Sequence, residues 1–151
     1  MIALLQRVSE AEVRIQGTVA SAIGAGILAL IGVRRGDTAA SAERLAERLL
    51  GYRVFADTDG RMNLSLRDVG GALLLVPQFT LAADTHKGTR AGFSTAAPPE
   101  EAQRLFEHLR VCAARAYAPV SAGVFGAHMR VLLVNDGPVT FWLESPEGLS
   151  A

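Results

Sequence analysis

The sequence ALLLVPQFTL, residues 72–81, decides most of the fold. It opens with an uninterrupted apolar run that follows a Gly-Gly pair, and this pattern predicts a buried strand rather than a helix. Pro77 has no N–H to donate and fixes its own φ, so we expect regular pairing to end there. The backbone of Gln78, Phe79 and Thr80 would then present N–H groups that can hold an anion or a developing oxyanion.

A second apolar run, residues 131–134, is followed directly by the turn-forming sequence Asn135-Asp136-Gly137-Pro138. Asparagine, aspartate, glycine and proline are the residues that most often form turns. We therefore expect three short strands between Val120 and Leu143, separated by Gly126 and by this turn. In general only about 5–6% of X–Pro bonds in folded proteins are cis.

The rest of the chain alternates between strand and helix patterns. Strands are predicted over Ile2–Val8, over Glu12–Gln16, which alternates between apolar and polar residues, and over Gly26–Val33. An amphipathic helix is predicted over residues 38–50, capped by Asp37 and stopped by Gly51. A second helix begins at the Pro98-Pro99-Glu100-Glu101 segment, whose acidic residues suit a helix N-terminus. The pattern is that of an α+β chain rich in strands.

Composition narrows the classes of protein and partner. A chain of 151 residues and 16.0 kDa is the size of one domain, which we expect to span residues 1–151. The net charge is zero, so no overall positive potential attracts long nucleic acids to this chain. We therefore expect no DNA binding, and we expect any RNA ligand to be bound at one of its ends. A hydrophobic content of 50% fits either a surface covered by a partner subunit or a well-filled core. Without a leader or a long apolar run, we expect a cytoplasmic protein with no membrane contact.

Side-chain catalysts are scarce in this sequence. The three histidines, judged by their spacing to one another and to Cys112, are not expected to form a zinc site, and the Asp57–Gly60 segment lacks the rest of a calcium loop. We expect no metal and no cofactor. His108 is predicted to lie on a helix surface, and Cys112, the only cysteine, to be a buried structural thiol. The hydroxyl of Thr80 could take part in chemistry or make a structural hydrogen bond.

Two motifs carry a resemblance to a known family. Residues 78–81 (QFTL) and 135–140 (NDGPVT) resemble the two signature motifs of the D-aminoacyl-tRNA deacylases, the D-tyrosyl-tRNA deacylase family of bacterial type. Two motifs in the right order, about 55 residues apart in one short domain, are far more specific than either alone. There is one departure: the family usually has serine where this chain has Pro77.

The resemblance implies an architecture and a set of site residues. The fold would be a barrel-like arrangement of antiparallel and mixed sheets with two packing helices, forming a homodimer with shared active sites. The Gly137-Pro138 bond would be cis and inserted into the active site of the partner subunit, with Arg7, Asn135 and Thr140 in support. Phe125 and Met129 would line the pocket for the terminal adenosine, although either could equally belong to the core. Lys87 and Arg90 could meet phosphate, in a loop that departs from the usual Arg-Pro-Ser-Phe of the family.

The activity implied is hydrolysis of the ester that joins a D-amino acid to the 3′ end of a tRNA. Backbone N–H groups of Phe79 and Thr80 would stabilise the oxyanion, and the terminal ribose 2′-hydroxyl would position water, so no cofactor is needed. A carbonyl at Gly137 would exclude L side chains and could not exclude glycine, so glycyl-tRNA is expected as a substrate. The alternative is a non-catalytic dimeric module that binds nucleic-acid ends.

Overall fold

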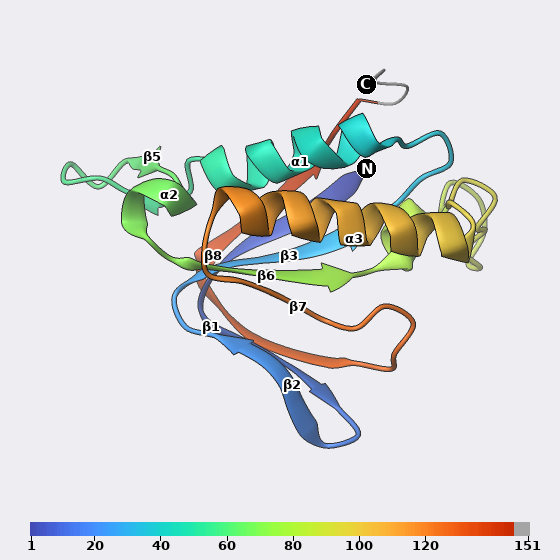
Figure 1. Cartoon of the computed structure of the whole chain (residues 1–151), viewed down its shortest axis with the longest axis horizontal. Coiled ribbons are helices and arrows are strands. Elements are labelled where there is room, and N and C mark those ends of the chain that lie inside the picture. Colours follow the sequence, from blue (N-terminus) through green and yellow to red (C-terminus); the bar gives the residue numbers. More distant parts are fainter. Residues whose placement is uncertain (147–151) are drawn as a thin grey trace.

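A mixed, strongly curved sheet forms the centre of the molecule (Figure 1). The structure is a computed structural model that describes residues 1–146, so the last five residues of the predicted domain lie outside the described part. The strand order is β2-β1-β3-β6-β7, with β8 pairing to β1. The strands are β1 (Ile2–Ile15), β2 (Thr18–Ile23), β3 (Gly26–Gly32), β6 (Ala72–Pro77), β7 (Val120–Ala122) and β8 (Arg130–Glu144). β1 is antiparallel to β2, β3 and β8, whereas β6 is parallel to β3 and β7.

Two long helices, α1 (Ala39–Gly51) and α3 (Pro99–Ala116), lie side by side over one face of the sheet (Figure 1). Smaller elements complete the chain: β4 (Phe55–Ala56), β5 (Met62–Leu64), α2 (Leu66–Val69) and the 3₁₀ helix η1 (Phe79–Ala82). The α+β class and the two packing helices are therefore confirmed. The short α2 was not predicted.

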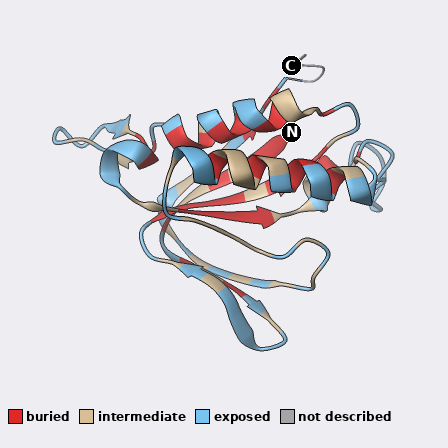
Figure 2. Cartoon of the chain, viewed as in Figure 1, coloured by how far each residue is buried: buried red, intermediate tan, exposed pale blue. Residues whose placement is uncertain are grey.

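Strand β6 explains why the run in residues 72–76 has no polar alternation. Leu73 and Leu75 belong to the core beneath α1 and α3, whereas Leu74 and Val76 face a second apolar cluster on the opposite side of the sheet. All four side chains are buried, and Figure 2 shows β6 and its neighbour β3 as the most continuously buried strands. A strand covered on both faces has no solvent-facing positions for polar residues.

The start of α1 differs from the prediction by one residue. Thr38, not Asp37, is the N-cap, and it forms a capping box with Ser41. Asp37 is instead buried, and its carboxylate is satisfied there: it pairs with the Met1 ammonium over 2.5 Å and accepts the Arg34 backbone N–H over 2.6 Å. Gly51 is the last helical residue rather than the residue after the helix.

The structure joins strands that the sequence had divided. β1 is one strand of 14 residues, whose first half pairs with β3 and whose second half pairs with β2. The prediction of three strands after Val120 was wrong, because β8 continues through Asn135–Pro138 instead of turning there. The extra residues are absorbed where the β1–β8 register shifts around Arg7.

Two further findings concern the backbone. The Gly137–Pro138 peptide is cis, and so is Ala118–Pro119, which the sequence did not indicate. Across residues 1–146, none of the helices has the length and apolar character required to cross a membrane.

Candidate active site

The first motif begins where β6 ends. Pro77 is the last residue of β6 and pairs in register with Ile31 of β3, so the strand ends at Pro77 as predicted. The next N–H, that of Gln78, donates to the Ile31 carbonyl over 2.7 Å. Successive N–H groups of a strand point to opposite sides, so the Pro77 nitrogen faces β7 rather than β3. The pairing of β6 with β7 has already ended at Leu75.

The backbone of residues 79–82 then forms η1, with Gln78 at its N-cap position. The first N–H groups of a helix have no partner inside it. Among the described residues, no acceptor is found for the N–H of Phe79 or of Thr80. Both residues are exposed, so these two N–H groups are available to a ligand.

The side chains around these amides are held by local contacts. The Gln78 amide nitrogen donates to the Thr80 hydroxyl oxygen. The Phe79 ring is 58% exposed and packs against Phe93 of the following loop, with ring centroids 5.1 Å apart. No histidine or carboxylate makes a hydrogen bond to the Thr80 hydroxyl within residues 1–146, so Thr80 lacks the base that would activate a nucleophile.

A hollow of about 730 Å³ opens beside Thr80. It lies between η1, the following loop and the end of β8, and its lining includes Arg34, Asp84, His86, Trp142 and Glu144. Trp142 is 49% exposed, and its indole N–H donates to the Glu144 carboxylate over 2.7 Å. That hydrogen bond, together with the Arg34 charge, lowers the pKa of Glu144. Trp142 and Glu144 were not among the sequence candidates because they lie in no motif.

The segment proposed to hold adenosine is next to this end of β6. The Gly123 N–H donates to the Leu75 carbonyl, and a Cβ at Gly123 would lie 2.8 Å from the Met129 sulfur and 3.5 Å from Pro77. Met129 packs against the second apolar cluster and accepts the Val124 N–H. Phe125 packs against Phe106 of α3 and also lines a hollow of about 480 Å³ that contains Arg104 and Arg110. Both residues therefore have core contacts.

Lys87 and Arg90 lie in the loop between η1 and α3. Both are exposed, and the loop is closed at its base by the paired backbones of Asp84 and Gly92. The same loop contacts η1 through Phe93, which packs against Phe79.

The second motif is a bulge held by side chains on both sides. The Asn135 side chain accepts the Val139 N–H over 2.9 Å and donates to the Thr140 hydroxyl over 2.8 Å. Arg7 of β1 donates through Nε to the Asp136 carbonyl over 2.9 Å, and through its guanidinium to the Val54 carbonyl over 2.7 Å. Arg7, Asn135 and Thr140 thus fix the backbone on either side of Gly137 and Pro138.

Gly137 occupies a position that only glycine fits. Its φ is +139°, and a Cβ there would lie 2.7 Å from the Val139 side chain and 3.2 Å from the Arg7 guanidinium. Gly137 and Pro138 are both exposed, whereas Arg7 and Asn135, which hold the backbone on either side, are partly buried. The dipeptide therefore projects from a rigid support.

The register of the sheet places the two motifs at different positions along and across the strands. Strand pairing places Pro77 of β6 in one row across the sheet with Ile31 of β3, Ala3 of β1 and Leu143 of β8. Residues 136–139 of β8 lie opposite Arg7 of β1, and the row of Arg7 continues through Ile27 of β3 to Leu73 of β6. Four residues separate the rows, about 13 Å along the strands, and three strand spacings, about 14 Å, separate β6 from β8. Measured along the sheet, the end of β6 and Gly137 are therefore well separated within one chain.

Comparison with known proteins identifies the family. The family model described as D-Tyr-tRNA(Tyr) deacylase matches residues 4–144. The chain belongs to the D-Tyr-tRNA(Tyr) deacylase family. This confirms the family that the two motifs predicted, and membership of a deacylase family makes the chain a hydrolase.

Curated relatives in the D-Tyr-tRNA(Tyr) deacylase family extend over nearly the whole chain. A D-aminoacyl-tRNA deacylase of Thioalkalivibrio sulfidiphilus is 68% identical over 146 residues, covering 97% of this chain and 98% of the relative. One from Nitrosococcus oceani is 60% identical, with 97% and 94% covered.

Solved structures support the same fold. A protein described as c-Myc DNA Unwinding Element Binding Protein is 39% identical, with a TM-score of 0.92 and 97% and 99% of the two chains covered. A probable eukaryotic D-amino acid tRNA deacylase aligns with a TM-score of 0.78 over 95% and 98%; at 16% identity it supports the fold alone.

Proposed function

We propose that the chain is a D-aminoacyl-tRNA deacylase that holds the tetrahedral intermediate with backbone N–H groups. The observation that carries this proposal is the pair of unpartnered, exposed N–H groups of Phe79 and Thr80 beside a hollow of about 730 Å³. Hydrolysis of an ester develops negative charge on the carbonyl oxygen, and two convergent N–H donors are suited to stabilise it.

The attacking water needs little help from side chains. An aminoacyl ester is already activated, and the hydroxyl of Thr80 is bonded to Gln78 rather than to a base. The substrate itself supplies a polar group, because the terminal ribose carries a 2′-hydroxyl next to the ester. This hydroxyl would position the water, so the protein contributes the oxyanion donors and the orientation of the substrate.

Each complete site would contain parts of two subunits. The two motifs are well separated on the sheet of one chain, and a second copy would bring its Gly137 and Pro138 to the Phe79 amide of the first. Exposed apolar side chains on β8, Leu132 and Val134, suit burial in such a homodimer. A two-fold dimer would make two equivalent sites.

Chirality would be selected by exclusion. D and L substrates differ by exchange of the hydrogen and the side chain on Cα. A carbonyl at Gly137, fixed through Arg7 and Asn135, would occupy the position of an L side chain and leave a D side chain free toward solvent. Such a site would not discriminate among D side chains and could not exclude glycine, and glycyl-tRNA(Ala) is accordingly part of the proposal.

The remaining contacts would hold the 3′ end of the tRNA. Met129 lies beside Gly123 next to the end of β6, and Phe125 follows two residues after Gly123; the thioether or the aromatic face could contact the terminal adenine. Lys87 and Arg90 would contact the phosphate backbone. Because charged tRNA is the substrate, the cytoplasm is the expected location.

The first experiment measures turnover under single-turnover conditions. D-tyrosyl-tRNA and L-tyrosyl-tRNA are each incubated with excess protein, and the release of free amino acid is followed. We expect hydrolysis of the D substrate and sparing of the L substrate. Binding of both without hydrolysis of either would support the alternative, a non-catalytic module for nucleic-acid ends, and would overturn the proposal.

The second experiment tests the shared site by mixing two inactive variants. Phe79→Pro removes one oxyanion donor, and Arg7→Ala releases the support of Gly137. In a mixed dimer of the two variants, one site would carry both defects and the other neither. Equal mixing after subunit exchange should therefore restore about one quarter of wild-type activity. No recovery in a dimer shown to be mixed would place both motifs in one subunit's site and contradict the model.

A further inference from the structure

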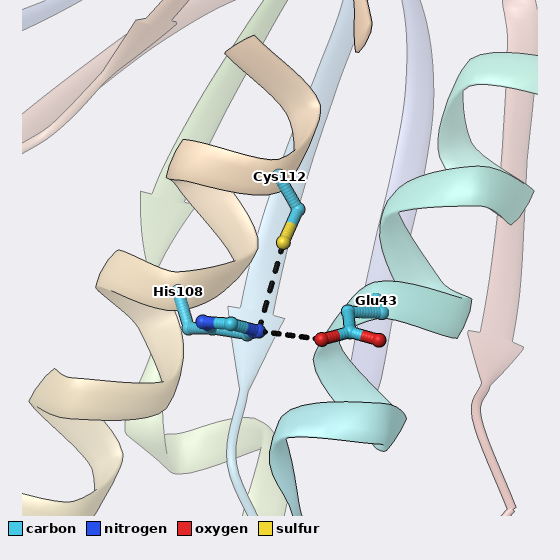
Figure 3. Close-up of side chains that lie close together, drawn as sticks. All are labelled: Glu43, His108 and Cys112. Atoms are coloured by element: carbon cyan, nitrogen blue, oxygen red, sulfur yellow. Dashed lines mark hydrogen bonds and ion pairs between the residues drawn. The ribbon is translucent and has the colours of Figure 1, made fainter. Parts of the chain in front are cut away.

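A cluster of three metal-binding side chains bridges the two long helices, on the face of the sheet that α1 and α3 cover. Glu43 extends from α1, and His108 and Cys112 extend from α3 toward it (Figure 3). The Nε2 atom of His108 lies 2.9 Å from a Glu43 carboxylate oxygen and 3.6 Å from the Cys112 sulfur. All three potential ligand atoms lie within 4.8 Å of one another.

The spacing of these atoms is close to that of a tetrahedral zinc site. Zinc lies about 2.0–2.3 Å from nitrogen, oxygen and sulfur ligands, so neighbouring ligands in a tetrahedron are about 3.4–3.6 Å apart. The observed distance of 3.6 Å from sulfur to nitrogen already fits. Glu43 is exposed, and a small rotation of its side chain would bring the carboxylate to the same separation.

The helix fixes two of the ligands in advance. His108 and Cys112 are four residues apart, and side chains at this spacing lie on the same face of an α-helix. Two histidines at the same spacing bind zinc in the His-Glu-x-x-His motif. The expectation of no metal site rested on the spacing of the histidines to one another and to Cys112, and it was wrong about His108, which is four residues from Cys112.

We propose that Glu43, His108 and Cys112 form a zinc-binding site that clamps α1 to α3. A thiolate, an imidazole and a carboxylate are a ligand set that suits zinc and is foreign to magnesium or calcium. The three protein ligands leave a fourth position for water, because the cluster is only partly buried. Burial and the Glu43 charge raise the pKa of the Cys112 thiol, whereas the Arg115 charge lowers it.

The competing explanation is a simple helix–helix contact. In that case Glu43 and His108 form an ion pair, and Cys112 only packs beside them. The two explanations differ in the role of the thiol, which is a ligand in one and a bystander in the other.

Cobalt(II) provides a probe specific to this cluster. Cys112 is the only cysteine of the chain, so a thiolate-to-cobalt charge-transfer band can arise at no other residue. Titration of the full chain should produce this band together with the visible spectrum of a tetrahedral ion, saturating at one equivalent. Zinc chloride should then abolish the band by displacing the cobalt.

Variants assign the ligands. Cys112→Ser should abolish the band, and Glu43→Gln and His108→Gln should each weaken zinc binding by more than about 100-fold, since even outer-shell partners are worth 10–100-fold. The matched control is His128→Gln, which removes an exposed histidine outside the cluster and should bind like wild type. Zinc should also raise the Tm of wild type but not that of Cys112→Ser.

Two results would overturn the proposal. One is the absence of the charge-transfer band in the wild-type protein at saturating cobalt, a result that does not depend on the folding of any variant. The other is equal zinc affinity of wild type and a folded Cys112→Ser protein, which would make the thiol a bystander. Neither result bears on aminoacyl-tRNA hydrolysis, which uses other residues.

Discussion

Arg7 of β1 donates a hydrogen bond to the backbone carbonyl of Asp136 over 2.9 Å, and so connects the first strand to the peptide before Gly137. The same side chain donates to Val54 over 2.7 Å. Only a guanidinium offers several donors in a fixed geometry, whereas lysine is a point charge on a flexible stem. Arg7→Lys should therefore lower kcat/KM on D-tyrosyl-tRNA by about tenfold or more, despite the conserved charge.

The matched control for that substitution is Arg44→Lys. Arg44 is exposed on α1 and pairs with Glu47 one turn away, so kcat/KM should not change. Wild-type activity in Arg7→Lys would show that the Asp136 carbonyl does not need this donor.

Two substitutions at Phe79, both of which remove the aromatic ring, test whether the backbone N–H of this residue stabilises the oxyanion. Phe79→Ala keeps the backbone N–H, whereas Phe79→Pro removes it at the first position of η1, a position that tolerates proline. Phe79→Pro should be slower than Phe79→Ala by about 10²–10³ in the single-turnover rate. Equal rates would exclude this amide as an oxyanion donor.

The hydroxyl of Thr80 provides the complementary measurement. Thr80→Ala keeps the amide and loses only the contact with Gln78, so it should stay within about tenfold of wild type. A loss of more than about a thousandfold in a folded protein would indicate hydroxyl catalysis instead.

Gly26 is required by the parallel pairing of β3 with β6. A Cβ at Gly26 would lie 1.9 Å from the Ala72 carbonyl oxygen and 2.7 Å from its nitrogen, both of them backbone atoms. Gly26→Ala should lower the free energy of unfolding by about 3 kcal/mol or more, measured by urea denaturation at a fixed protein concentration. Gly24→Ala, where nothing lies within 4 Å, should change it by less than about 0.5 kcal/mol. Similar values for the two variants would contradict the close approach of β3 and β6.

Some features of the fold could be predicted from the sequence, and others depend on contacts between distant residues. The burial of Leu73–Val76 and the amphipathic stripe of α1 are local patterns, and both were predicted correctly. Asp37 and Thr38 are both good N-caps by residue type, and the choice between them depends on Met1, which is distant in sequence. Turn residues at 135–138 were predicted to end a strand, yet β1 supplies Arg7 to hold the bulge, and β8 continues.

The Met1–Asp37 pair predicts an effect on stability. Both groups are fully buried, and removing one partner of a buried ion pair leaves the other charge unpaired. Asp37→Asn should lower the free energy of unfolding by about 3 kcal/mol or more, whereas Glu47→Gln on the exposed face of α1 should cost less than about 1 kcal/mol.

The loss of stability in Asp37→Asn should depend on pH in a definite direction. Burial lowers the pKa of the Met1 ammonium from 8.0, and Asp37 opposes that shift, so Asp37→Asn should lower this pKa further. Between the folded and unfolded pKa values the unfolded chain binds more protons, so stability rises with pH. The defect of Asp37→Asn should therefore shrink as pH rises toward 8.0. A defect independent of pH would show that the ammonium is not the unpaired charge.

Glycyl-tRNA tests the exclusion mechanism assigned to Gly137. A site that recognises the amino group and Cα, and excludes L residues by overlap with a fixed carbonyl, has no physical means of distinguishing glycine from a D-amino acid. Glycyl-tRNA should be hydrolysed, and L-tyrosyl-tRNA should be spared by a wide margin, because overlap with a rigid carbonyl costs more than the 1–3 kcal/mol of a missing contact. Single-turnover rates on D-tyrosyl-, L-tyrosyl- and glycyl-tRNA under one condition decide the matter. If glycyl-tRNA is spared as thoroughly as L-tyrosyl-tRNA, the enzyme must bind the D side chain itself, and exclusion by Gly137 is wrong.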